Sequence, residues 1–101
     1  MADLEKAFTQ ELLDKCAQAE RACGYNPARL VQALTKYGGV RTARELLRKN
    51  GISDGFTRLQ TCGRLDLTLE ATVADRKYAA LFTDDEVNAC FALLCEYGFF
   101  G

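Results

Sequence analysis

The 101-residue sequence contains no histidine and no tryptophan, and it has a single proline. Without histidine, the chain lacks the commonest general base and the commonest protein metal ligand. Ser–His and Cys–His nucleophile pairs are therefore excluded within this chain. We expect no catalytic residue, no metal site and no cofactor, and the composition favours a binding protein over an enzyme.

Long apolar runs are also missing, since no stretch approaches the 18 apolar residues of a membrane span. The first residues lack the basic start and apolar run of a signal peptide. The number of cysteines, five, is odd, and no two of them are spaced as C-x-x-C. Most of them fall in helix-like segments. We expect free structural thiols, a cytoplasmic location and no membrane partner; a zinc site made of cysteines alone is the alternative for the thiols.

Apolar residues make up 49% of the chain and charged residues 27%, as in ordinary globular domains. Apolar side chains recur at helical spacing over residues 2–23, 27–37 and 41–49. Capping signals indicate a short helix that ends near Gly63 and a last helix that begins after Thr83. The sequence therefore predicts one all-α domain over residues 1–101, a compact bundle of five to six helices with short loops.

Individual residues mark where these helices begin and end. Gly24 ends the first helix, Asn26 is expected to cap the second, and Ser53 the fourth. Thr83–Glu86 reads T-x-x-E, a capping box, which predicts the start of the last helix. The aromatic residues assigned to apolar helix faces include Phe8, Tyr37 and Phe91. Tyr78 and Phe82 are expected to be buried in the connector before the last helix.

Residues 65–70 are ambiguous. The alternation of leucine with polar residues fits a strand, but no second convincing strand is available to pair with it. A helix capped by Asp66 is the favoured interpretation. It would place Asp66 and Glu70 on one face, next to Arg64, so these three residues form a candidate ligand site. A purely structural role for these residues is the favoured interpretation, and the ligand site is the alternative.

The net charge of −1 conceals strong segregation. The formal net charge is −2 for residues 1–25, +6 for residues 26–64 and −5 for residues 65–101. The favoured interpretation is that the acidic C-terminal segment packs beside the basic middle segment and neutralises part of its charge. A nucleic-acid surface on the basic segment is the alternative. The candidate contact residues are Arg41, Arg44, Arg48, Lys49 and Arg58.

The C-terminal residues Tyr97, Phe99 and Phe100 are apolar and lie where chains commonly fray. If these residues are exposed, they form a hydrophobic surface patch, so they are candidate interface residues. We expect a homodimer or another protein as the partner, with nucleic acid as the alternative.

Two resemblances extend this interpretation. Ala33-Leu34, Gly38-Gly39, Ala43, Leu46-Leu47, Gly51-Ile52-Ser53 and Arg58-Leu59 resemble the helix-turn-helix of Fis-type transcription regulators, which implies contact with the DNA major groove. Tyr25-Asn26-Pro27, Tyr37-Gly38-Gly39-Val40, Ser53–Leu59, Gly63–Glu70 and Leu81-Phe82-Thr83 are similar to a helical module of small uncharacterised bacterial proteins, including products of mobile elements such as integron cassettes. The second resemblance implies a bacterial cytoplasmic domain without a known activity.

The leading hypothesis from the sequence is a non-enzymatic, self-associating interaction domain. A nucleic-acid-binding protein that uses residues 26–64 is the first alternative. A ligand binder or enzyme centred on the candidate ligand site is the second.

Overall fold

The structure, a computed structural model, describes residues 2–49 and 55–99. Over these residues the chain forms six α-helices and two short 3-10 helices, with no strand. The prediction of an all-α fold is confirmed, but five to six helices is too low because two connections are themselves helical. The elements are α1 (Ala2–Cys23), α2 (Ala28–Tyr37), α3 (Gly39–Arg48), α4 (Phe56–Cys62), η1 (Leu65–Leu67), α5 (Leu69–Val73), η2 (Arg76–Leu81) and α6 (Asp84–Glu96).

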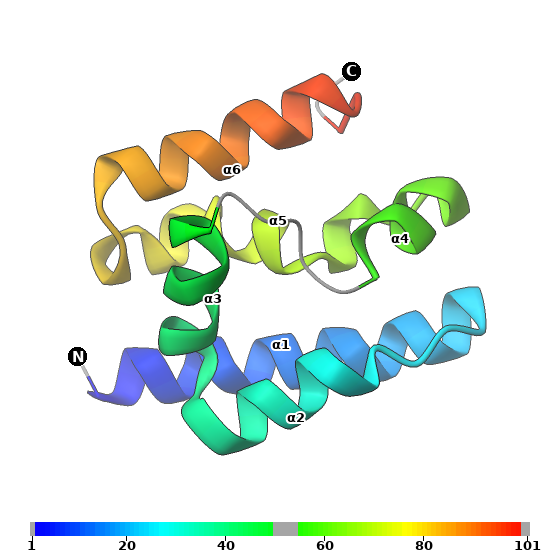
Figure 1. Cartoon of the computed structure of the whole chain (residues 1–101), viewed down its shortest axis with the longest axis horizontal. Helices are drawn as coiled ribbons and strands as arrows, with labels where there is room; N and C mark the ends of the chain where they lie inside the picture. Colours follow the sequence, from blue (N-terminus) through cyan, green and yellow to red (C-terminus); the bar gives the residue numbers. More distant parts are fainter. Residues whose placement is uncertain (1, 50–54, 100–101) are drawn as a thin grey trace.

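The helices are arranged in layers (Figure 1). α1 and α2 lie side by side and run in opposite directions, α6 lies on the opposite side of the molecule, and α4 and α5 lie between them. α3 stands across these layers and contacts both α1 and α6. The basic helix α3 is therefore held between the N-terminal and C-terminal helices.

The main core lies along α1. Apolar residues spaced three or four apart give this helix one buried face, on which Phe8 and Leu12 are almost fully covered. The Phe8 ring meets the rings of Tyr78 and Phe82 edge-on, with centroids 5.1 and 5.2 Å away. Full burial of such a side chain stabilises the fold by about 1.5–3 kcal/mol. Phe8 thus fixes the segment 78–82 against the N-terminal helix.

A sharp corner at Gly38 separates α2 from α3. Gly38 has a φ of +84°, in the left-handed region that favours glycine. At Gly39 a Cβ atom would lie 2.8 Å from Cδ2 of Phe8, so α3 begins in direct contact with α1. The Gly39 N–H donates a hydrogen bond of 2.8 Å to Oγ1 of Thr9. The two glycines therefore set the angle between α3 and the other helices.

The ambiguous segment 65–70 is helical but broken at Thr68, whose ψ of 156° is extended. The Thr68 Oγ1 accepts a hydrogen bond from the Ala71 N–H, so Thr68 caps α5 and the prediction of Asp66 as the cap is wrong. The cause is burial, since Leu65, Leu67 and Leu69 all point into the core. In one continuous helix, residues two apart differ by about 200° around the axis, and Leu67 would face outward.

Other local expectations have mixed outcomes. The capping box is confirmed, with Thr83 Oγ1 accepting from the Glu86 N–H and Oε1 of Glu86 accepting from the Thr83 N–H. The N-cap of α2 is Pro27 without a side-chain hydrogen bond, so the cap predicted at Asn26 is wrong. Ser53 lies outside the described residues, and α4 has Gly55 as its N-cap. Of the aromatic residues predicted to be buried, Phe8, Tyr78 and Phe82 are buried. Tyr37 and Phe91 are not, since each is 48% exposed.

The cysteines also differ from expectation. Cys23 and Cys62, 39 residues apart in sequence, form a disulfide with a Cα–Cα distance of 6.0 Å. The prediction of free thiols is wrong for this pair, because the folding of α4 onto α1 brings together two residues whose proximity is not visible in the sequence. Buried Cys16, buried Cys90 and exposed Cys95 are not part of a disulfide.

Candidate functional site

The basic residues of α3 lie on the surface. Arg41, Arg44 and Arg48 recur at spacings of three and four, so they follow one side of the helix while Val40 and Ala43 are buried on the other. The apolar side anchors α3 in the core and leaves the arginines facing outward. The sequence pattern of this helix therefore produces a row of cations on the molecular surface.

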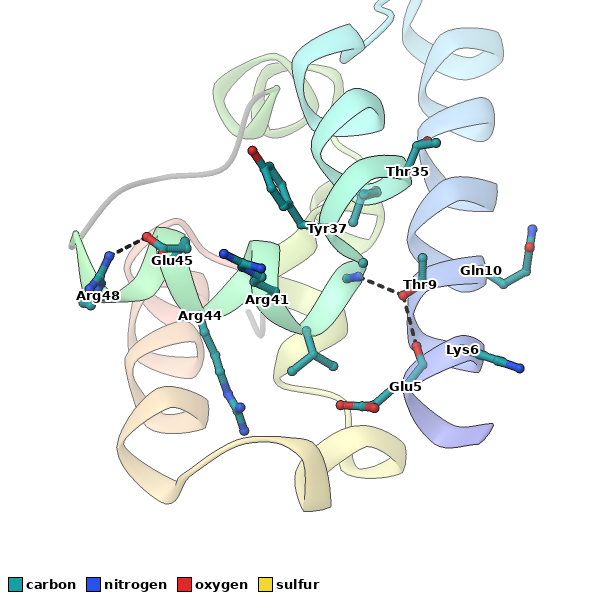
Figure 2. A pocket seen from close by; sticks show the side chains of 14 residues that line it. Glu5, Lys6, Thr9, Gln10, Thr35, Tyr37, Arg41, Arg44, Glu45 and Arg48 are labelled. Atoms are coloured by element: carbon teal, nitrogen blue, oxygen red, sulfur yellow. Dashed lines mark hydrogen bonds and ion pairs between the residues drawn. The ribbon is translucent and has the colours of Figure 1, made fainter. Parts of the chain in front are cut away.

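An open groove of about 920 Å³ runs between α3, the end of α2 and the N-terminal half of α1. Arg41, Arg44 and Arg48 line it from α3, and Glu5 reaches toward α3 from the α1 side (Figure 2). Its apolar residues include Leu34, which is buried at the end of α2. The corner at Gly38 forms one end of this groove, which we call the α3 groove.

A second, smaller hollow of about 360 Å³ adjoins the α3 groove. Lys49, the residue that follows α3, lines it together with Arg41 and Tyr37, which line both hollows. Four of the five predicted nucleic-acid residues therefore come together on one surface. The fifth, Arg58, lies on α4, where its guanidinium carbon is 5.3 Å from the Tyr25 ring centroid.

The acidic C-terminal segment leaves this surface largely open. Among the ion pairs of the described residues, one joins α3 to α6: Nε of Arg44 lies 3.9 Å from Oε2 of Glu86. Arg44 also donates a hydrogen bond of 2.7 Å to the Leu81 carbonyl, yet its side chain is 54% exposed. The Arg48 side chain is 72% exposed. The basic face is thus tethered to the acidic helix at one arginine and is not covered by it.

One carboxylate lies within the row of arginines. Glu45 accepts a hydrogen bond of 2.6 Å from Nη2 of Arg48, and this bond and the Arg48 charge lower the pKa of Glu45. The pair is exposed, so the attraction is screened by solvent and worth little to stability. Arg48 can exchange this contact for a phosphate at little cost, whereas Arg41 contacts the Tyr37 ring.

Tyr37 is a surface residue that the sequence interpretation placed in the core. It is the last residue of α2 and is 48% exposed. The Lys36 Nζ and the Arg41 guanidinium carbon lie 5.2 and 5.1 Å from its ring centroid. The sequence places this tyrosine between basic residues, which suits an exposed nucleic-acid surface. Helical periodicity also assigns it to the apolar face, and periodicity alone does not distinguish an exposed position from a buried one.

The candidate ligand site is not assembled. Arg64 and Asp66 form a bidentate pair at 3.1 and 3.2 Å, and this hydrogen bonding lowers the pKa of Asp66. Glu70 lies beyond the break at Thr68 and is buried within α5, whereas Asp66 is exposed. The structure therefore does not bring the two carboxylates onto one face, and Arg64 is already paired.

Aromatic residues near the C-terminus contribute a second surface. Tyr97 packs edge-on against Phe56 with centroids 5.1 Å apart and remains 40% exposed, and Phe99 is 37% exposed. Phe100 lies outside the described residues. Phe91, which the sequence interpretation missed as a surface residue, lies six residues before Tyr97, within α6.

Comparisons with protein-family models, curated proteins and solved structures give no match to this chain. The two sequence resemblances therefore rest on the residues quoted for them and stay predictions. Within residues 2–49 and 55–99, no helix is long and apolar enough to cross a membrane. The same residues contain no group of three or more cysteine, aspartate or glutamate side chains placed to hold a metal ion.

Proposed function

We propose that this chain is a non-enzymatic binding domain that binds nucleic acid through the α3 groove. The observation that carries the proposal is the exposed row of Arg41, Arg44 and Arg48 along an open groove. Arginine presents several donors in a planar fork that suits phosphate oxygens. Each phosphate contact also releases condensed counterions, which favours binding at low salt.

The experiment measures binding of labelled oligonucleotides by fluorescence anisotropy between about 50 and 200 mM salt. The variant R41Q/R48Q removes two exposed charges from the groove. The control R21Q/R76Q removes two exposed charges elsewhere and gives the same net charge. We expect the groove variant to bind about ten- to a hundredfold more weakly and its salt slope to fall by about 1.4 to 1.8, while the control changes little.

Two outcomes would contradict this function. One is an absence of binding to any oligonucleotide at the lowest salt concentration. The other is an equal loss of affinity in the groove variant and the control, because net charge and not the groove would then explain the binding.

A cytoplasmic location is part of this proposal, because nucleic acid is available there. Disulfides are rare in that compartment. The proposal therefore requires the domain to bind with Cys23 and Cys62 as thiols as well as with the disulfide formed.

Self-association through α6 is the second candidate function. The helix is apolar on its inner face, where Cys90 and Leu94 are buried, and Phe91 adds a large exposed side chain outside. A helix that is apolar on both sides is normally covered on both. Residues 87–95 carry no charge, so two copies can pair along this stretch without opposing like charges. The partner we propose for this face is a second copy of the chain.

A further inference from the structure

Tyr37 occupies an unusual position for a large aromatic side chain. It stands on the surface where the α3 groove and the smaller hollow meet, and it lines both. Arg41 lines the same two hollows, and Lys49 lines the smaller one. An exposed aromatic ring flanked by cations is the arrangement by which proteins stack a base and hold the neighbouring phosphates.

We propose that the α3 groove binds a single nucleic-acid strand, with one base stacked on Tyr37 and the flanking phosphates on Arg41 and Lys49. This inference rests on the nucleic-acid binding proposed above and adds the class of nucleic acid. The cations near the ring do not prevent stacking, because Lys36 and Arg41 are both exposed. Each can move from the ring to a phosphate as the base enters.

The shape of the groove favours one strand over a duplex. A helix that reads duplex DNA enters the major groove and must protrude from the protein surface. The arginines of α3 instead line a recess of about 920 Å³, within the range of ordinary ligand sites, which reach about 1,000 Å³. A recess of this size accommodates a few nucleotides of one strand.

The charges of the two groove walls lead to the same conclusion. The α3 wall carries three arginines and one carboxylate, Glu45, which is paired with Arg48. The α1 wall carries Glu5, which points toward α3, and Lys6, which points away from α3 in the same view (Figure 2). A single strand along α3 therefore meets an excess of cations, whereas a second phosphate backbone on the α1 side would meet one carboxylate and one ammonium group, with no net positive charge.

The test compares a single strand of about 12 nucleotides with a duplex of the same length and sequence. We expect Tyr37→Leu to weaken binding of the single strand about 5- to 150-fold, the range for the loss of one stacked base. Tyr37→Phe keeps the ring and should bind like the unmodified chain. Phe91→Leu is the matched control, because Phe91 is also 48% exposed but lies on α6.

The outcomes separate this inference from the function on which it rests. If single strand and duplex bind equally and Tyr37→Leu has no effect, while R41Q/R48Q still weakens binding, the inference is overturned and nucleic-acid binding stands. If neither form of nucleic acid binds, both fail. Preferential binding of the single strand that depends on the Tyr37 ring supports the inference.

Discussion

At the scale of single residues, Cys90 shows how burial changes the chemistry of a side chain. It lies on the inner face of α6, almost fully covered by the core. Burial, together with the charges of Glu70 and Glu86, raises the pKa of Cys90 from 9.0 to about 12. The thiol is therefore a packing group in the folded chain and is protonated at neutral pH, unlike the activated thiolates of catalytic cysteines.

This shift predicts a loss of stability in alkaline solution. In the unfolded chain the Cys90 thiol ionises near pH 9.0, but in the folded chain it stays protonated to about pH 12. Above pH 9 the unfolded state therefore binds fewer protons, and the free energy of unfolding falls by about 1.4 kcal/mol per pH unit. Urea unfolding at a series of pH values measures this slope.

The matched variants for this prediction are Cys90→Ala and Cys95→Ala. Cys95→Ala is the control, because it removes an exposed cysteine of the same helix region and leaves Cys90 in place. Cys90→Ala should flatten the slope between pH 9 and 10. Above pH 10 a contribution from Tyr78 remains, because burial and the hydrogen bond to Glu11 raise the pKa of that phenol. An unchanged slope in Cys90→Ala below pH 10 would contradict the assignment.

At the scale of elements, signals that act over one helical turn were readable in the sequence. The capping box at Thr83 and the stop at Gly63 involve neighbouring residues, so the sequence contains all the groups that form them. The break at Thr68 was not readable. The break arises because Leu65, Leu67 and Leu69 are all buried. Their burial depends on the helices that pack around them, which the local sequence does not show.

In the candidate site, too, local features were predictable and features that depend on packing were not. The arginines of α3 share a helix face, so their common exposure was predictable from spacing. The participation of Tyr37 and Glu5 was not, because it depends on the contact of α3 with α1, where Gly39 meets Thr9 across 30 residues. Arg58 lies on α4 beside Tyr25 and lines neither hollow, because the chain turns between α3 and α4.

Helix α6 carries the prediction of self-association. Phe91→Glu introduces a charge into the middle of the uncharged stretch 87–95 and should convert a dimer into a monomer, because pairing would bury that charge. Gln18→Glu adds the same charge to an exposed position of α1 and should leave the dimer intact. Size exclusion with light scattering gives the mass of each species. A monomer for the unmodified chain at every concentration would rule out this role for α6.

At the scale of the whole molecule, the disulfide ties the far end of α1 to α4. Cys23 packs against a small cluster of Ala19, Leu59 and Leu67, separate from the main core. A further cluster anchors α4 through Phe56, which is buried with Leu65 and Leu94. The bridge adds to these clusters by restricting the unfolded chain over a separation of 39 residues.

Opening the bridge should weaken the fold but leave the α3 groove intact. We expect Cys62→Ser to lower the free energy of unfolding by about 2–4 kcal/mol, and reduction of the unmodified chain to give the same value. Cys95→Ser is the control, because this exposed thiol is unpaired.

Oligonucleotide binding should not change when the bridge is opened. Cys23 is separated from Gln10 at the groove by 13 residues of α1, about 20 Å. Five reactive thiols in the unreduced chain under denaturing conditions would refute the bridge. A loss of binding on reduction would show that the groove depends on the bridge and would contradict the proposed binding in the cytoplasm.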